Sequence, residues 1–164
     1  MRRLLPLVFL ALLASACGAT KHVDVKVTTT RATPAPGPGH VLYKGGGWAV
    51  LLQGHKASAE HLVGGVWTPD RSGVVKVDIL GPKPNQKVAA TPQVAAQLIG
   101  NAPLVESALW VDGTELQEKG GGLNPKRGTI YGAPAAPLAA GRHVAVAYAR
   151  TAAHGTAVAW VFTV

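Results

Sequence analysis

The fold is decided by Leu138-Ala-Ala-Gly-Arg-His-Val-Ala-Val-Ala-Tyr-Ala-Arg-Thr-Ala-Ala-His-Gly-Thr-Ala-Val-Ala-Trp-Val-Phe-Thr-Val164. Large apolar residues occupy every second position in two runs, which are Val144, Val146 and Tyr148, then Val158, Trp160 and Phe162. This period of two is typical of β-strands, because successive side chains point to opposite faces. Gly155 stands where the chain is expected to reverse. The stretch predicts a hairpin that forms part of a sandwich, so the upstream chain must supply an opposing sheet.

Composition favours an all-β protein. Hydrophobic residues make up 48 % of the 164 residues, aromatic residues only 5 %, and the chain carries 20 glycines and 12 prolines. Glycine and proline are frequent in turns and disfavour long helices. The net charge of +8 is spread over single Lys and Arg residues apart from Arg2-Arg3 and Lys126-Arg127. A soluble basic surface is therefore favoured over nucleic-acid binding, and weak attraction to anionic wall polymers or lipid headgroups fits the same charge.

The amino terminus has the organisation of an export signal. Met1-Arg2-Arg3 is positively charged, residues 4–13 are apolar, and Ala14-Ser15-Ala16 supplies small residues for cleavage. The apolar run is shorter than the ~20 residues that a membrane-spanning helix needs. The next residue, Cys17, is the only cysteine of the chain.

Ala14-Ser15-Ala16-Cys17 resembles the lipobox of bacterial lipoproteins. The resemblance implies cleavage before Cys17 and a diacylglyceryl group with palmitate on its sulfur. It departs from the family at Ala14, where leucine is commonest, and the alternative is a plain secretory signal with an incidental cysteine. A lipidated Cys17 leaves no free thiol, which excludes disulfides, thiolate metal sites and a cysteine nucleophile.

Four segments follow from this organisation. Residues 1–16 are expected to be the lipoprotein signal peptide, and 17–40 a lipid-anchored, Pro/Thr-rich linker that forms a disordered tether. Residues 41–77 are expected to form an N-terminal β-meander, and 78–164 the sandwich. Expected strands in these two parts include 48–53, 56–63, 74–80 (with Val75, Val77 and Ile79 on one face), Val88, 93–99, and a 107–116 hairpin turning at Asp112-Gly113.

From about residue 78 the chain resembles bacterial immunoglobulin-like domains. The matching segments, in order, are Leu80-Gly81-Pro82-Lys83-Pro84-Asn85, Leu109-Trp-Val-Asp112-Gly113, Leu138 with Gly141-Arg142-His143-Val144, and Trp160-Val-Phe162-Thr-Val164. The sequence departs from that family at 151–156, where Asp and Asn are usual and Thr151 and His154 stand here. The resemblance implies an immunoglobulin-like β-sandwich that acts as a spacer, adhesion or carbohydrate-binding module, usually without catalytic residues.

Histidines supply the candidates for a metal site. Six are present, His22, His40, His55, His61, His143 and His154. No pair has the i,i+2 spacing that would place two ligands on one face of a strand. His55 and His61 are expected to meet across a hairpin with Glu60 beside them, and His154 is a further weak candidate. Copper-binding periplasmic sandwiches are similar in their last strands but place a ligand histidine at the mature N-terminus, where this chain has Cys17. We therefore expect neither a metal nor another cofactor.

Other candidates are weighed against plain structural roles. Glu106, Glu115 and Glu118 with Asp112 are a possible pair of carboxylates for a small hydrolase, although solvated surface is the default interpretation. Trp110 and Trp160 are expected in the core. Trp48 and Trp67 are possible ligand contacts, since exposed aromatic rings stack on sugars. Lys126 and Arg127 are possible anion contacts in a Gly-rich loop.

The sequence predicts a non-enzymatic protein, exported and lipid-anchored to the outer face of the cell membrane (or to an outer membrane), whose immunoglobulin-like module binds or scaffolds. Expected partners are the membrane through Cys17, and wall glycan or another envelope protein, without nucleic acid. A copper-binding sandwich protein and a small envelope hydrolase are the alternatives.

Overall fold

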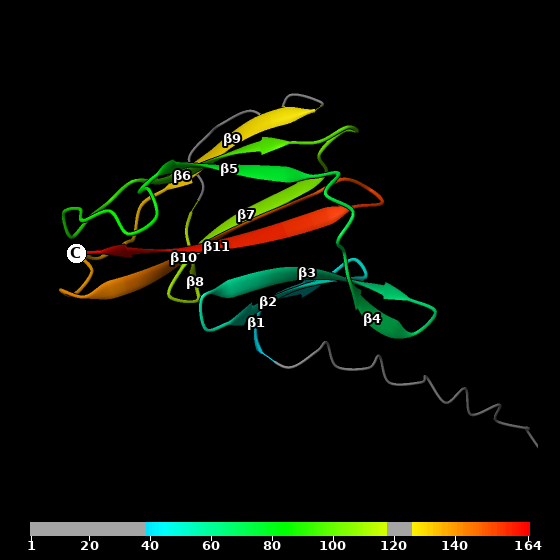
Figure 1. Cartoon of the computed structure of the whole chain (residues 1–164), viewed down its shortest axis with the longest axis horizontal. Coiled ribbons are helices and arrows are strands. Elements are labelled where there is room, and N and C mark those ends of the chain that lie inside the picture. Colours follow the sequence, from blue (N-terminus) through cyan, green and yellow to red (C-terminus); the bar gives the residue numbers. More distant parts are fainter. Residues whose placement is uncertain (1–38, 118–125) are drawn as a thin grey trace, which may run out of the picture. The chain divides into compact units, whose positions relative to one another are not determined.

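A computed structural model of the chain describes residues 39–117 and 126–164, all of which belong to one compact unit (Figure 1). These residues form strands and loops, with no helix among them. The strands are β1 His40–Gly45, β2 Trp48–Gln53, β3 Lys56–Val63, β4 Val66–Pro69, β5 Lys76–Gly81, β6 Val94–Ile99, β7 Glu106–Val111, β8 Thr114–Glu115, β9 Arg127–Gly132, β10 Arg142–Arg150 and β11 Gly155–Thr163.

The strands form three antiparallel sheets. The meander sheet has the order β1-β2-β3-β4, the central sheet β11-β10-β7-β8, and the third sheet β5-β6-β9. The third and central sheets share a hydrophobic core and make up the sandwich. The first, second and fifth strands of this part, β5, β6 and β9, thus lie opposite β7, β8, β10 and β11. The predicted all-β sandwich with extra N-terminal strands is therefore confirmed.

The central sheet is buried on both faces. Toward the third sheet it presents Leu109, Trp160 and Phe162 together with Ala145, Ala147 and Ala149. Toward the meander sheet it presents Trp110, Val146 and Tyr148, which pack on Trp48 and Val50. The alternation in the terminal hairpin thus separates two cores, with the larger residues of β10 on one side and its alanines on the other. Both sets of alternating side chains of β10 are buried, which is why the strand is apolar along most of its length.

The meander sheet follows the sequence closely. β2 and β3 have the predicted bounds, and the turn at Gly64-Gly65 leads into β4. In the sandwich, β5 begins at Lys76, so the expected boundary between 77 and 78 falls inside this strand. Val88 lies outside any strand, although its N–H donates to the Thr163 carbonyl at 2.9 Å. Turn chemistry is as expected at Asp112-Gly113, whose φ values are +50° and +82°.

Gly155 has a different role from the expected one. It lies in β11, while residues 151–154 make the turn. A Cβ built on Gly155 would lie 2.7 Å from Cζ3 of Trp48. The Trp48 ring also stacks on His61, with ring centroids 4.3 Å apart and the planes 2° from parallel. The absence of a side chain at Gly155 is therefore needed for the meander sheet to approach the central sheet.

Candidate functional site

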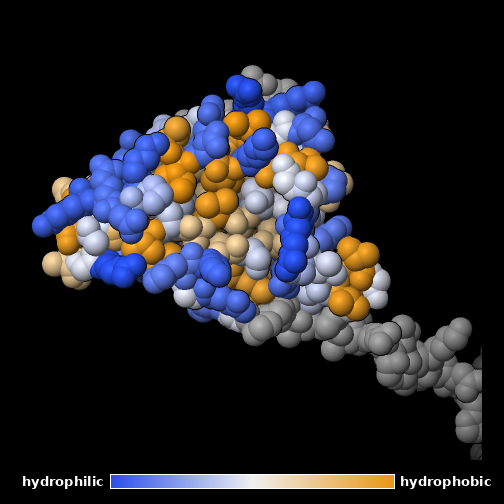
Figure 2. All heavy atoms as spheres, in the orientation of Figure 1, coloured by the Kyte–Doolittle hydropathy of each residue, from blue (hydrophilic) through white to orange (hydrophobic). Residues whose placement is uncertain are grey.

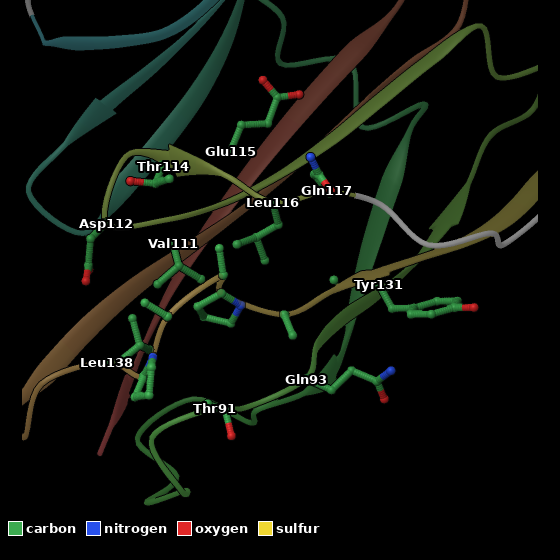
Figure 3. A pocket seen from close by; sticks show the side chains of 16 residues that line it. Thr91, Gln93, Val111, Asp112, Thr114, Glu115, Leu116, Gln117, Tyr131 and Leu138 are labelled. Carbon is green, nitrogen blue, oxygen red and sulfur yellow. The ribbon is translucent and has the colours of Figure 1, made fainter.

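A hollow of about 930 Å³ lies beside the β7–β8 hairpin (Figure 3). Its walls come from residues 111–117, residues 131–138, and Thr91 and Gln93 before β6. The segment after β8 packs tightly on the end of β9, since a Cβ on Gly132 would lie 2.9 Å from the Cβ of Leu116. The hollow is thus built on the third and central sheets of the sandwich.

Aliphatic side chains line the middle of the hollow, and polar groups lie at its margin. Val111, Leu116 and Leu138 surround its centre in Figure 3. Glu115 points away from it, and the Tyr131 hydroxyl lies far from the centre. Ligand sites in proteins are commonly apolar hollows of roughly 300–1,000 Å³ with a few polar groups. This hollow has that size and character.

Asp112, at the margin of the hollow, contacts the buried side chain of His143. His143 Nδ1 lies 2.7 Å from Asp112 Oδ2, and its Nε2 lies 2.8 Å from the Ala139 carbonyl. Asp112 Oδ1 also accepts from the Val144 N–H at 2.9 Å. Both partners of the imidazole are acceptors, so both contacts are hydrogen bonds only when the ring is protonated. The bond to Asp112, with help from Ala139, raises the pKa of His143 against the opposing effect of burial.

The carboxylates of the hydrolase hypothesis do not gather at one place. Glu106 accepts from the Tyr43 hydroxyl and from Arg150 Nε, each at 2.5 Å, and so joins β1, β7 and β10. Asp112 is occupied by His143 and Val144. Glu115 is exposed at the margin of the hollow, with its side chain directed away from it. Glu118 lies outside the described residues.

The candidate metal ligands are also separated, which corrects the expected meeting of His55 and His61. His55 sits in the β2–β3 turn, whereas His61 pairs with Trp48 at the other end of these strands. His154 lies 3.3 Å from Asp70. In residues 39–117 and 126–164, no group of three or more His, Cys, Asp or Glu side chains has the arrangement of a metal site.

Asp70 links the meander sheet to the start of β11. Its Oδ2 accepts from the Gly155 N–H at 2.8 Å, and its Oδ1 accepts from the Ser72 N–H at 2.8 Å. Burial acts to raise the pKa of Asp70, but hydrogen bonds from Ser72, Gly155 and His154 outweigh it and lower this pKa. The turn at 151–154 therefore serves as an attachment point between sheets.

The tryptophans divide between core and surface. Trp110 and Trp160 are buried, as predicted. Trp48 is only 1 % exposed, so its ring is a core element and is closed to a ligand. Trp67 is half-buried, with Lys44 Nζ 5.7 Å from its ring centroid. Lys126 and Arg127 are exposed at the start of β9, away from the residues that line the hollow.

Sequence reasoning missed the aliphatic hollow. Leu116 and Leu138 are separated by more than twenty positions, and the packing of the segment after β8 on Gly132 at the end of β9 brings their segments together. The proline-containing segment 133–140 was the one available signal, because a stretch without strand or helix pattern often forms the wall of a site.

Cys17 lies outside the described residues. In the part of the chain that is described, no helix has the length and apolar character needed to cross a bilayer. No protein-family model matches this chain, and no curated protein matches it either.

Proposed function

We propose that this protein is an exported lipoprotein that uses its immunoglobulin-like sandwich to bind an apolar ligand at the cell envelope without catalysis. The observation that carries the binding role is the hollow of about 930 Å³ with Val111, Leu116 and Leu138 around its centre. Aliphatic groups on a small molecule or on an envelope protein match such a surface. Wall glycan is a poorer match, because sugars bind on exposed aromatic rings and Trp48 is buried.

The acidic residues support a non-catalytic role. Glu106, Asp112 and Asp70 each hold strands or turns together through hydrogen bonds. A general acid or base must reach its substrate. These three carboxylates instead accept hydrogen bonds from other parts of the chain. Attachment to a membrane is supported by the sequence of residues 1–17, in which a charged start, an apolar run and small residues precede Cys17.

Binding in the hollow is tested with Nile red, an uncharged apolar dye, on the protein and on Ala136→Trp. Ala136 lines the hollow and is exposed, so the indole fills the site without disturbing the core. We expect the fluorescence increase of the dye to fall about tenfold. Ala153→Trp, at an exposed turn outside the hollow, is the matched control and should bind as the unchanged protein does. Equal dye binding by both variants would show that the hollow is not the site.

Lipid attachment is tested separately by labelling cells with palmitate. The unchanged chain should incorporate the label, and Cys17→Ala should not. If the two chains are labelled equally, the lipid is not on Cys17.

A further inference from the structure

The β3–β4 hairpin ends in an apolar tip. Val63 and Val66 are paired across its turn and are 58 % and 64 % exposed. The turn residues Gly64 and Gly65 have φ values of +59° and +84°, and a Cβ on either would meet no atom within 4 Å. The tip thus projects into solvent, and Figure 2 shows an orange group at the right-hand edge of the coloured atoms, where Figure 1 places the β3–β4 turn.

Behind the tip comes an aromatic ring and then a cation. The next pair inward is Leu62 with Trp67, and both are half-buried. Lys44 reaches over the Trp67 ring from β1, with its ammonium 5.7 Å from the ring centroid. Residues at a membrane interface follow the same order from the hydrocarbon to the headgroups: aliphatic side chains come first, then tryptophan, then lysine.

We propose that this tip, Val63 to Trp67 with Lys44, docks the folded part onto an anionic lipid bilayer. The proposal rests on the membrane attachment described above and adds a second contact, made by the folded part itself. Without Arg2 and Arg3 of the signal peptide the chain keeps a net charge of +6, which complements an anionic surface. Two exposed valines fall far short of the roughly 1,200 Å² that a specific protein interface buries, whereas shallow insertion needs little apolar area when charge assists it.

The position of the tip is compatible with a tether. β1 begins at His40, opposite Leu52, while the tip lies beyond the Trp48–His61 pair at the other end of the sheet. About six strand residues separate these ends, or roughly 20 Å. Residues 18–39 would span about 25 Å as a coil and about 70 Å when extended. A chain anchored at Cys17 can therefore place the tip on the same bilayer.

The experiment uses the chain from residue 18 onward, which lacks both the signal peptide and the lipidation site. Both hydrophobic cores consist of residues after Gly39, so this chain keeps them whole. Sedimentation with vesicles of phosphatidylcholine and phosphatidylglycerol (3:1) is compared with sedimentation with phosphatidylcholine alone. We expect binding to the anionic vesicles only, and about a tenfold loss of affinity in Val63→Ser/Val66→Ser.

The matched control is Leu80→Ser/Val105→Ser, which removes two large apolar residues that are 46 % and 52 % exposed elsewhere. It should bind vesicles like the unchanged chain. Brominated lipids should quench the fluorescence of the unchanged chain but not that of Trp67→Phe.

Equal binding by the two double variants, or binding that does not depend on phosphatidylglycerol, would overturn the proposal. So would self-association of the chain that Val63→Ser/Val66→Ser abolishes, because the tip would then pair with a second copy. None of these outcomes depends on whether palmitate labels Cys17.

Discussion

Gly155 shows how much a single absent side chain can contribute. Gly155→Ala places a Cβ at 2.7 Å from the Trp48 ring, which is fixed by its stack on His61. Overpacking of this kind costs about 1–3 kcal/mol. Urea unfolding should therefore show a lower free energy of unfolding for Gly155→Ala. Gly81→Ala is the control, since its nearest neighbour would be the Gln93 carbonyl at 4.0 Å. Equal losses in the two variants would contradict this role of Gly155.

His143 makes stability depend on pH. Its pKa is raised in the folded protein above the usual 6.5, so the folded state binds the proton more tightly than the unfolded state. The stabilisation is complete below about pH 6.5 and is lost as pH rises through the raised folded pKa. We expect His143→Gln to destabilise the protein by about 1–3 kcal/mol at pH 5.5 and by clearly less at pH 9. Thermal unfolding at both pH values measures this, and a loss that is the same at each would contradict a protonated ring.

Asp112 and Gly155 also show what could be read from the sequence at this scale. The turn at Asp112-Gly113 was predictable because a tight hairpin turn needs residues that accept positive φ, and that preference is local. The role of Gly155 depends on Trp48, which is more than a hundred positions away. Local rules supplied only a turn glycine there. The acceptors on both nitrogens of His143 likewise come from separate segments.

Among the elements, β1 is joined to the sandwich by a polar cluster around Glu106. Glu106 on β7 accepts from Tyr43 on β1 and from Arg150 on β10. Glu106→Gln leaves the mostly buried Arg150 without its ion pair and should cost about 1–3 kcal/mol. Tyr43→Phe removes one hydrogen bond and should cost about 0.5–1.5 kcal/mol. Urea unfolding of the two single variants and the double variant should show a combined loss smaller than the sum. Strict additivity would mean that the cluster does not act as a unit.

The strands themselves were largely predictable, because each carries its own period of two and is bounded by glycine or proline. β2 and β3 are examples in which the predicted bounds hold. The hollow was not predictable, since its aliphatic residues belong to segments that meet only where the third sheet packs on the central sheet. The cluster around Glu106 was hidden for the same reason.

At the scale of the whole molecule, the three sheets should differ in their local stability. β10 is paired on both edges, with β7 and β11, and is covered on both faces. Its amides should therefore exchange with solvent most slowly. β4 lies at the edge of the meander sheet and is largely exposed, so its amides should exchange first. Hydrogen exchange followed by mass spectrometry measures both. Protection of β4 equal to that of β10 would contradict the difference and would mean that the meander sheet opens only with the sandwich.

The sandwich could be predicted as a class, whereas its second core could not. Alternation in β10 tells which side chains share a face, but it does not tell whether the other face meets water. The alanines at 145, 147 and 149 are compatible with either environment. Only the packing of the meander sheet against Trp110, Val146 and Tyr148 decides that both faces are covered.

The contact between Gly155 and Trp48 has a consequence for the divergence of related chains. The two positions share one volume, so a side chain can be gained at 155 only if the ring at 48 becomes smaller. Substitutions at these positions should therefore occur together along a lineage and seldom alone. In an alignment of homologous sequences, positions 48 and 155 should then covary, even where neither residue is invariant. That covariation would reflect the contact between the two sheets.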